Sequence, residues 1–250
     1  GNDRFTKEGD YYLSEGEKKQ IAEITKYNQN IVLIINTGAQ IDLTEMQQNE
    51  AVKGIVYLSQ PGCEAGNVIA DIISGKVNPS GKLTSTWSVK YEDFPNAATF
   101  SHCNGDTTNE KYEEGIYVGY RYFDSFGVKT LYPFGYGLSY TTFTTDHVQV
   151  AAEGNTVTVT ATVTNTGKAA GKQVVEVYAA CPQEARSREL KKLVGFKKTS
   201  LLKPGESENV TVAVDAKNFA SFDEKQAAWV VDAGEYAIFV SEHAEQNTLS

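Results

Sequence analysis

The 250-residue sequence has little of what several classes of protein require. It contains three cysteines, Cys63, Cys103 and Cys181, which lie far apart and lack Cys-x-x-Cys spacing. This pattern is neither a disulfide framework nor a zinc site, and it favours reduced thiols in a cytoplasmic protein. No signal peptide is recognisable. The chain starts at Gly1 without a methionine, so we expect an upstream segment and leave a secreted or periplasmic origin open.

Long apolar runs and an excess of positive charge are also absent. No stretch of about 18 apolar residues occurs, so we expect no membrane span. The net charge of −9 argues against nucleic acid or an anionic membrane surface as a partner, because neither would be attracted electrostatically. Neutral ligands such as sugars are compatible with this charge. A hydrophobic content of 40% is sufficient for a packed core in one large domain or two ordinary ones.

Motifs for nucleotide or serine-hydrolase chemistry are incomplete. Residues 75–82 have five rather than four residues between the glycines of a phosphate loop, and Leu83 replaces its Ser or Thr. Residues 135–137, Gly-Tyr-Gly, lack the third glycine of a dinucleotide fingerprint, and no Gly-x-Ser-x-Gly elbow occurs. The isolated histidines, expected on the surface or in loops, are His102, His147 and His243. We therefore expect no cofactor.

Carboxylates that could perform acid–base chemistry are plentiful, but the sequence alone pairs no two of them. Those on predicted loops are Asp3, Glu8, Asp10, Glu113, Glu114 and Asp124. Solvated surface charge is the default interpretation for each.

Helix and strand signals alternate in the first half of the chain. Ser14 and Glu17 form a capping-box pattern, which predicts a helix over residues 14–28. Five consecutive branched residues at 31–35 predict a strand buried on both faces, as in a parallel sheet. Further predicted elements are a helix over 43–49, a strand over 54–58, a helix over 64–74 and a strand over 83–87. This alternation indicates an α/β layered domain.

A long polar loop and an aromatic segment follow. Residues 88–109 have weak periodicity, and long loops in compact domains are usually functional. Residues 110–145 hold seven of the 14 tyrosines together with several glycines. Because aromatic rings bury large areas and glycines allow sharp turns, we predict that this segment connects two domains.

The last hundred residues change to a period of two. The predicted strands are 148–150, 155–163, 174–178, 190–198, 208–214, 229–231 and 235–241. About seven short strands separated by turns indicate a β-sandwich of immunoglobulin or fibronectin type III character. The Cys–Trp–Cys pattern of antibody domains is absent.

Four stretches carry a resemblance to a known family. Residues 1–4, Gly-Asn-Asp-Arg, look like the end of a Gly-Glu-Gly-x-Asp-Arg motif. The other stretches are 60–66 with 78–83, 112–122 with 133–140, and 163–167 through 193–196 and 202–206. Together they cover nearly the whole chain and resemble the C-terminal portion of glycoside hydrolase family three, the β-glucosidase and β-xylosidase group.

The resemblance implies an α/β sandwich domain followed by a fibronectin type III-like β-sandwich. We predict the α/β domain over 1–109, the aromatic connector over 110–145 and the β-sandwich over 146–250. In this family a (β/α)8-type barrel precedes these domains and holds a nucleophilic Asp, and a loop of the α/β domain supplies an acid/base Glu. Hydrolysis is typically retaining, which requires the two carboxyl groups to lie about 5–5.5 Å apart.

Neither catalytic carboxylate has a counterpart in this chain under that resemblance. The barrel is absent, and the acid/base Glu would immediately precede Gly1. Asp3 and Arg4 match the family residues that follow it, so we predict that they orient the acid/base loop. The implied partners are an N-terminal barrel domain or chain and a β-linked glucoside or oligosaccharide, and homo-oligomer formation is left open. The isolated chain is expected to be catalytically inert.

Two other interpretations stay open. One is a non-catalytic carbohydrate-binding or scaffolding module built on the same two domains. The other is a different hydrolase that uses Asp3 or Glu8 directly, although neither has a motif-defined partner. If a barrel domain normally covers the α/β half, that half should expose an apolar surface of unusual size for a monomer.

Overall fold

The computed structural model describes residues 5–100, 104–106, 108–183 and 188–245 of the chain. These residues divide into two compact units. The first unit comprises Gly1–Ser74 and Trp87–Glu113, and the second comprises Gly75–Thr86 and Glu114–Ser250. The predicted domain boundaries at 109 and 145 stay predictions. No described helix is long and apolar enough to cross a membrane.

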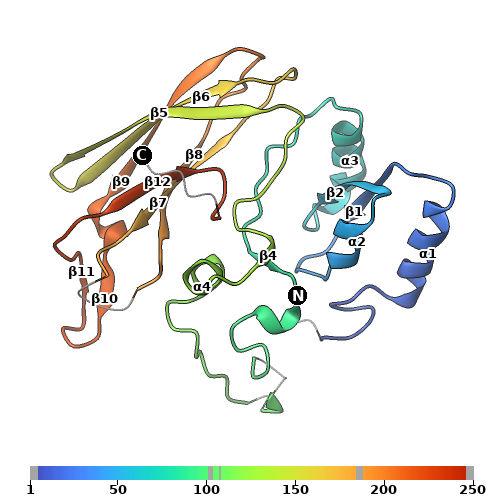
Figure 1. Cartoon of the computed structure of the whole chain (residues 1–250), viewed down its shortest axis with the longest axis horizontal. Coiled ribbons are helices and arrows are strands. Elements are labelled where there is room, and N and C mark those ends of the chain that lie inside the picture. Colours follow the sequence, from blue (N-terminus) through green and yellow to red (C-terminus); the bar gives the residue numbers. More distant parts are fainter. Residues whose placement is uncertain (1–4, 101–103, 107, 184–187, 246–250) are drawn as a thin grey trace. The chain divides into compact units, whose positions relative to one another are not determined.

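The first unit alternates helices and strands, as the sequence predicts. Its helices are α1 (Glu15–Thr25), α2 (Thr44–Gln48) and α3 (Ala65–Ile73), and its strands are β1 (Ile31–Ile35), β2 (Val52–Tyr57) and β3 (Trp87–Ser88) (Figure 1). Strands β1 and β2 pair in parallel, with Leu33 opposite Ile55. The parallel pairing confirms the expectation drawn from the branched residues of β1.

Helix α1 begins where the capping-box pattern places it. The backbone N–H of Ser14 donates to the Glu17 carboxylate at 2.8 Å, and the backbone N–H of Glu17 donates to the Ser14 hydroxyl at 3.3 Å. Two backbone N–H groups that a helix start leaves unpaired are thus satisfied reciprocally. The Ser14 hydroxyl and backbone bonds also hold the pKa of Glu17 below its usual value.

Burial in the first unit is less complete than predicted. The expectation that residues 31–35 are buried on both faces is wrong, because no residue of β1 is buried and Val32 is 46% exposed. Helices α1 and α3 likewise bury no residue. The buried apolar residues of this unit are Tyr11, Ile41, Leu43, Met46, Ala51 and Trp87. Its apolar surface is therefore open at several elements.

The predicted strand over 83–87 is also wrong, because only Trp87 and Ser88 adopt strand structure. Leu83 instead makes two close backbone hydrogen bonds within the second unit. Its N–H donates to the Tyr136 carbonyl at 2.9 Å, and its carbonyl accepts from the Gly135 N–H at 2.8 Å. The segment before Trp87 thus follows the glycine-rich stretch at 135–137 instead of joining a sheet.

The second unit is a sandwich of two antiparallel sheets with an added hairpin (Figure 1). One sheet has the order β5 (Phe143–Glu153), β6 (Thr156–Asn165) and β9 (Ser207–Asp215). The other has the order β12 (Ala237–Ser241), β7 (Val174–Ala180) and β8 (Lys192–Lys198). The hairpin joins β10 (Ser221–Asp223), which the sequence patterns missed, to β11 (Ala228–Val230). The period of two in the sequence thus predicted most of these strands.

The core of the sandwich lies between the two sheets and explains the alternating sequence. Along β6 the buried Val159, Ala161 and Val163 alternate with residues that are only partly buried. Strand β9 repeats the pattern with Val210, Val212 and Val214. Residues of both sheets form one hydrophobic cluster, as sheet-on-sheet packing requires.

The segment predicted as a connector contains two elements that the sequence patterns missed, helix α4 (Tyr120–Phe126) and strand β4 (Thr130–Tyr132). Helix α4 starts after Gly119 and ends at Gly127, whose φ of 63° is left-handed and allows a sharp stop. Phe123 is buried, and the Tyr120 ring packs edge-on against Tyr178 of β7 at 5.7 Å between centroids. Packing against the β-sandwich therefore stabilises this short aromatic helix.

Candidate functional site

The two residues predicted to support the acid/base loop, Asp3 and Arg4, lie outside the described residues. Their role stays a prediction. The described chain resumes at Phe5, and the segment beginning there forms one side of a groove.

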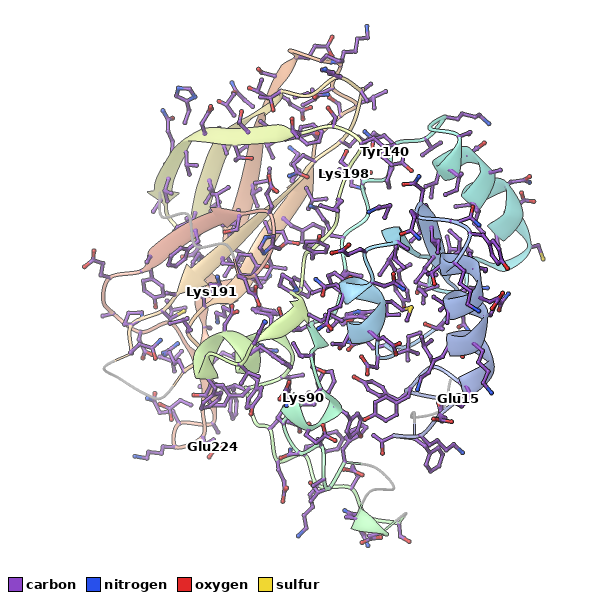
Figure 2. The ribbon with its side chains drawn as sticks, turned by 45° about the vertical axis from the view of Figure 1, so that its right-hand side comes forward. Glu15, Lys90, Tyr140, Lys191, Lys198 and Glu224 are labelled. Carbon is purple, nitrogen blue, oxygen red and sulfur yellow. The ribbon has the colours of Figure 1, made fainter. Side chains whose placement is uncertain are left out.

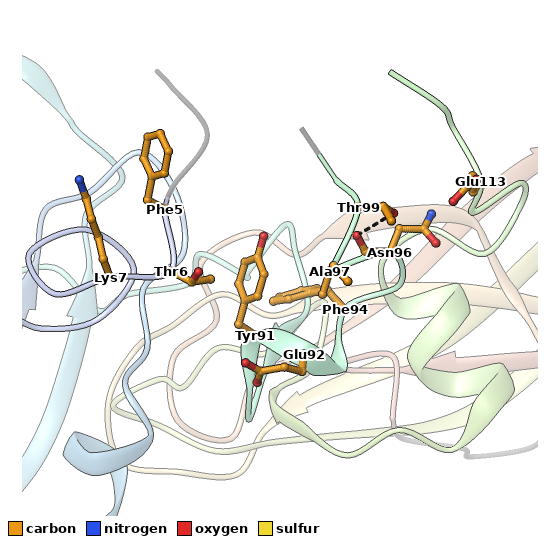
Figure 3. A pocket seen from close by; sticks show the side chains of 11 residues that line it. Phe5, Thr6, Lys7, Tyr91, Glu92, Phe94, Asn96, Ala97, Thr99 and Glu113 are labelled. Atoms are coloured by element: carbon orange, nitrogen blue, oxygen red, sulfur yellow. Dashed lines mark hydrogen bonds between the residues drawn. The ribbon is translucent and has the colours of Figure 1, made fainter. Parts of the chain in front are cut away.

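The groove lies within the first unit and has a volume of about 830 Å³. Figure 3 shows Phe5 and Lys7 on one side, Asn96 and Thr99 on the other, and the Tyr91 ring between them. Its other lining residues are Thr6, Glu92, Phe94, Ala97, Ala98 and Glu113. Ligand pockets commonly combine apolar and aromatic walls with a few polar groups in a volume of about 300–1,000 Å³. The groove has this composition and size.

A compact turn fixes the first side of the groove. The Phe5 N–H donates to the Asp10 carboxylate at 3.0 Å, and the Phe5 carbonyl accepts from the N–H groups of Lys7 at 2.8 Å and Tyr11 at 3.2 Å. The Lys7 ammonium lies 4.9 Å from the centre of the Phe5 ring. Tyr11 is buried beneath the turn and packs edge-on against Tyr91 at 5.3 Å, which ties the two sides together.

The second side belongs to the loop predicted over residues 88–109. A single helical turn at Tyr91–Asp93 is capped by the Asp93 carboxylate, which accepts from the Lys90 N–H at 3.1 Å. Asn96 follows in a left-handed conformation with φ of 57°, a region that Asn tolerates better than most residues. Its carbonyl accepts from the N–H groups of Thr99 and Phe100 at 2.9 and 2.8 Å, which closes the turn.

The Asn96 side chain has an unsatisfied donor. Its Nδ2 atom is buried and has no hydrogen-bond partner among the described residues. A buried amide N–H without a partner costs roughly 1–3 kcal/mol. Non-glycine residues in left-handed backbone conformations cluster at active sites and ligand-binding sites.

The charges of the groove favour a neutral ligand. Among the described residues that line it, the ionisable side chains apart from Tyr91 are those of Glu92, Glu113 and Lys7, so two carboxylates outnumber one ammonium. Beneath the groove, burial raises the pKa of Tyr11 above its ordinary value. The groove combines two segments that lie about 90 residues apart in the sequence. The sequence alone therefore indicated this region only through the length of the loop over residues 88–109.

Segment 133–140, part of one stretch that carries the family resemblance, is held within the second unit by a buried polar cluster. The Tyr178 hydroxyl donates to the buried Glu176 carboxylate at 2.6 Å, and burial raises the pKa of Glu176. The Lys82 ammonium donates to the Gly137 carbonyl at 3.0 Å, and burial lowers the pKa of Lys82. Gly135 has φ of 83°, and a Cβ there would come within 2.8 Å of the Glu176 carboxyl carbon. These contacts fix the backbone and are structural.

Asp124, one of the candidate carboxylates, also has a structural position. Asp124 lies on helix α4, and its carboxylate is 3.7 Å from the ammonium of Lys191, which Figure 2 labels. Both side chains are almost fully buried. The ammonium also lies 5.3 Å from the centre of the Tyr178 ring. Burial raises the pKa of Asp124 to about 6, because its cost exceeds the attraction of Lys191.

The remaining candidates are scattered in the same way. Glu8 is exposed and lies 3.9 Å from Lys18, whereas Asp10 accepts the Phe5 N–H. Of the candidates that the structure describes, Glu113 alone lines the groove, and Glu114 belongs to the second unit. The structure therefore brings no two candidate carboxylates into a catalytic pair among the residues that it describes.

The histidines and cysteines assemble no metal site in the described part of the chain. His147 is exposed and lies 2.6 Å from Asp146, while burial lowers the pKa of His243. Cys63 is an exposed free thiol and Cys181 a buried one. His102 and Cys103 lie outside the described residues.

Comparison with known proteins accounts for both units. Residues 1–120 match the family described as Glycosyl hydrolase family 3 C-terminal domain, and residues 173–244 match the Fibronectin type III-like domain. Beta-glucosidase A of Butyrivibrio fibrisolvens is 37% identical over 263 residues, covering 96% of this chain and 31% of that protein. Exo-alpha-(1->6)-L-arabinopyranosidase of Bifidobacterium longum is 41% identical over 89% of this chain and 29% of its own length.

A solved structure agrees with these matches. Beta-glucosidase 3B from Thermotoga neapolitana, in complex with alpha-D-glucose, superimposes with a TM-score of 0.89 and 38% identity. The match covers 97% of this chain and 34% of that one, so the chain spans about a third of the length of these relatives. The predicted fold class, an α/β domain followed by a fibronectin type III-like β-sandwich, is confirmed. The chain belongs to glycoside hydrolase family three, as a C-terminal portion that carries the family's α/β and fibronectin type III-like domains.

Proposed function

We propose that this chain is the C-terminal part of a retaining β-glycosidase, specifically a β-glucosidase that removes terminal β-linked glucose from oligosaccharides or glycosides. The observation that carries this proposal is the match of nearly the whole chain to beta-glucosidases in both sequence and structure. A (β/α)8-type barrel, as an N-terminal domain or chain, supplies the nucleophilic Asp. The acid/base Glu directly precedes Gly1.

In this mechanism the chain positions groups and does not itself attack the substrate. Retaining hydrolysis needs an acid/base carboxyl about 5–5.5 Å from the nucleophile, so the loop that carries it must be held firmly. Asp3 and Arg4 orient that loop from its C-terminal side. The turn that follows is anchored by Asp10 and by the buried Tyr11, which fixes where the loop enters the α/β unit.

A second substrate class has a specific observation in its favour. The relative from Bifidobacterium longum, which is 41% identical, is named for an arabinopyranoside rather than a glucoside. We therefore include an α-L-arabinopyranoside in the test. The cytoplasmic location stays a proposal that rests on the sparse cysteines.

The test compares the isolated chain with the parent protein on 4-nitrophenyl β-D-glucoside and 4-nitrophenyl α-L-arabinopyranoside. We expect the parent protein to hydrolyse the glucoside with the higher kcat/KM and the isolated chain to show only background hydrolysis. A higher kcat/KM on the arabinopyranoside would contradict the proposed glucoside substrate and identify an α-L-arabinopyranoside as the substrate instead. Hydrolysis by the isolated chain above background would contradict the division of catalytic residues, and a parent protein inactive on both would refute the enzyme itself.

A further inference from the structure

We propose that the hairpin of β10 and β11 binds a neutral polysaccharide chain through the aromatic pair of Phe222 and Trp229. Phe222 is 49% exposed and Trp229 is 72% exposed, and the two residues lie directly opposite each other in the register of the hairpin. The choice of a β-linked glucan as this chain rests on the proposed function. The hairpin would add a binding activity that the proposed hydrolysis does not require.

The alternation of side chains along the strands turns both rings toward solvent. Ser221 precedes Phe222, and its hydroxyl accepts from the Arg188 guanidinium at 2.6 Å. The Arg188 side chain is almost fully buried, so the face of the hairpin that carries Ser221 is turned toward the protein interior. Because successive side chains of a strand lie on opposite faces, Phe222 and its cross-strand neighbour Trp229 lie on the outer face.

Buried contacts at one end of the hairpin and a tight turn at the other fix its backbone. The Arg188 guanidinium also pairs with the Asp232 carboxylate, so one buried cation holds the start of β10 and the chain just after β11. At the turn, the Asp223 carboxylate accepts from the N–H groups of Lys225 and Gln226 at 2.9 and 3.1 Å. The aromatic pair therefore stands on a support that is ordered before a ligand binds.

The two rings suit the faces of sugar rings. Their centroids are 5.7 Å apart and their planes meet at 69°, so each ring restrains the other through an edge-to-face contact. A glucose unit with equatorial hydroxyls presents C–H groups on its faces, and such a face packs against the apolar face of an indole. A β-linked glucan repeats this face along its length, so successive units meet Trp229 and Phe222. Rings restrained in advance lose little side-chain entropy when the chain binds.

The size and the charge of the surface favour such a chain over a protein or an anion. A stable protein interface takes about 20–30 residues on each side, whereas β10 and β11 have three residues each. The charged side chains of the hairpin are those of Asp223, Glu224 and Lys225, so two carboxylates outnumber one ammonium and an anionic ligand is not attracted. The exposed side chains of Gln226 and of Glu224, which Figure 2 labels, offer hydrogen bonds to sugar hydroxyls.

The binding test titrates the isotope-labelled chain with cellohexaose and follows the two indole N–H resonances by NMR. We expect a saturable shift of the Trp229 resonance and none of the resonance of Trp87, which is buried in the first unit. Trp229→Ala should weaken binding roughly tenfold, and Trp229→Tyr should recover most of it. The matched control is Phe196→Ala, which removes another exposed aromatic residue of the second unit, at 68%, and should leave the affinity unchanged.

Two results of this titration would overturn the assignment. One is a shift of Trp87 equal to that of Trp229, and the other is an affinity that Trp229→Ala leaves unchanged. Maltohexaose, an α-linked glucan, serves as the comparison ligand. Tighter binding of maltohexaose than of cellohexaose would refute the choice of a β-linked chain.

The second test uses the parent protein. We expect less of the Trp229→Ala variant than of the unmodified protein to sediment with swollen cellulose, while kcat/KM for 4-nitrophenyl β-D-glucoside is unchanged. An equal loss of kcat/KM on this small glucoside would show that the hairpin contacts another part of the parent protein, and it would overturn the proposal. If the parent protein hydrolyses no glucoside, the proposed function fails, and the NMR titration alone decides whether the hairpin binds sugar.

Discussion

At Gly135 a single hydrogen atom takes the place where any other residue has a side chain. Its φ of 83° is left-handed, and the space beside its Cα is filled by the carboxylate of Glu176, which accepts from Tyr178 at 2.6 Å. A substitution there meets two separate costs. One is backbone strain, about 1–2 kcal/mol for a left-handed residue, and the other is displacement of a buried carboxylate.

We therefore expect Gly135→Ala to lower the free energy of unfolding of the second unit by about 3 kcal/mol or more. The measurement is urea denaturation followed by far-UV circular dichroism. The matched control is Gly127→Ala, because Gly127 is also left-handed, with φ of 63°, but has no atom within 4 Å of the added Cβ. That variant should lose only about 1–2 kcal/mol. Equal losses in the two variants would show that Glu176 yields without cost.

Some single residues were predictable because their partners are local. Ser14 and Glu17 lie three positions apart, so the sequence alone shows the capping box that the structure contains. Gly135 and Asn96 were not predictable in the same way. Their roles depend on Glu176 and on a turn geometry that no short pattern in the sequence specifies.

At the scale of elements, helix α4 depends on tertiary contacts with the β-sandwich that its own sequence does not predict. It is rich in aromatic residues, which favour strands, and it was missed for that reason. It is held to the sandwich by Tyr120, whose hydroxyl accepts from the Leu193 N–H at 2.7 Å. Its Asp124 carboxylate is buried 3.7 Å from the Lys191 ammonium. The strands of the sandwich were predicted more accurately, because alternating burial imprints a period of two on the sequence.

The Asp124 carboxyl should make the stability of the second unit depend on pH. Burial raises its native pKa to about 6 from an ordinary value of 3.8, so the native state binds this proton more tightly than the unfolded state does. The resulting stabilisation is fully present below pH 3.8 and is lost as the pH rises through 6. Two pKa units correspond to roughly 3 kcal/mol. Asp124→Asn removes this contribution.

The measurement is the difference in unfolding free energy between the unmodified chain and Asp124→Asn from pH 3.5 to pH 7.5. Other carboxyl groups titrate in both proteins and cancel from the difference. We expect similar stabilities at pH 3.5 and a gap in favour of the Asn variant that grows to about 2–3 kcal/mol by pH 6.5 and then levels off. A difference that is flat, or that favours the unmodified chain at high pH, would mean that Lys191 compensates the buried charge.

At the scale of the whole molecule, the order of the two architectures could be predicted, whereas the groove could not. The spacing of apolar residues along a segment depends on whether that segment is a helix or a strand. The alternation of helices and strands, followed by the change to a period of two, can therefore be read from the sequence. The groove joins the turn at Phe5 to the loop at Tyr91, and its composition appears only when the fold brings them together. The prediction that β1 is buried on both faces was wrong for a related reason. The burial of a strand depends on the elements that pack against it, and its own sequence does not specify them.

The two units differ in the extent of their cores, and this should separate their unfolding. In the first unit helices α1 and α3 bury no residue, whereas the second unit contains a continuous core between two sheets. Since buried apolar area drives stability, the first unit should unfold at the lower urea concentration.

The chain has two tryptophans, and one lies in each unit: Trp87 is buried in the first, and Trp229 is 72% exposed in the second. In a Trp229→Phe variant all tryptophan fluorescence reports on Trp87. We expect its red shift to precede the main loss of β-sheet signal in circular dichroism. Coincident transitions would show that the two units unfold as one cooperative body.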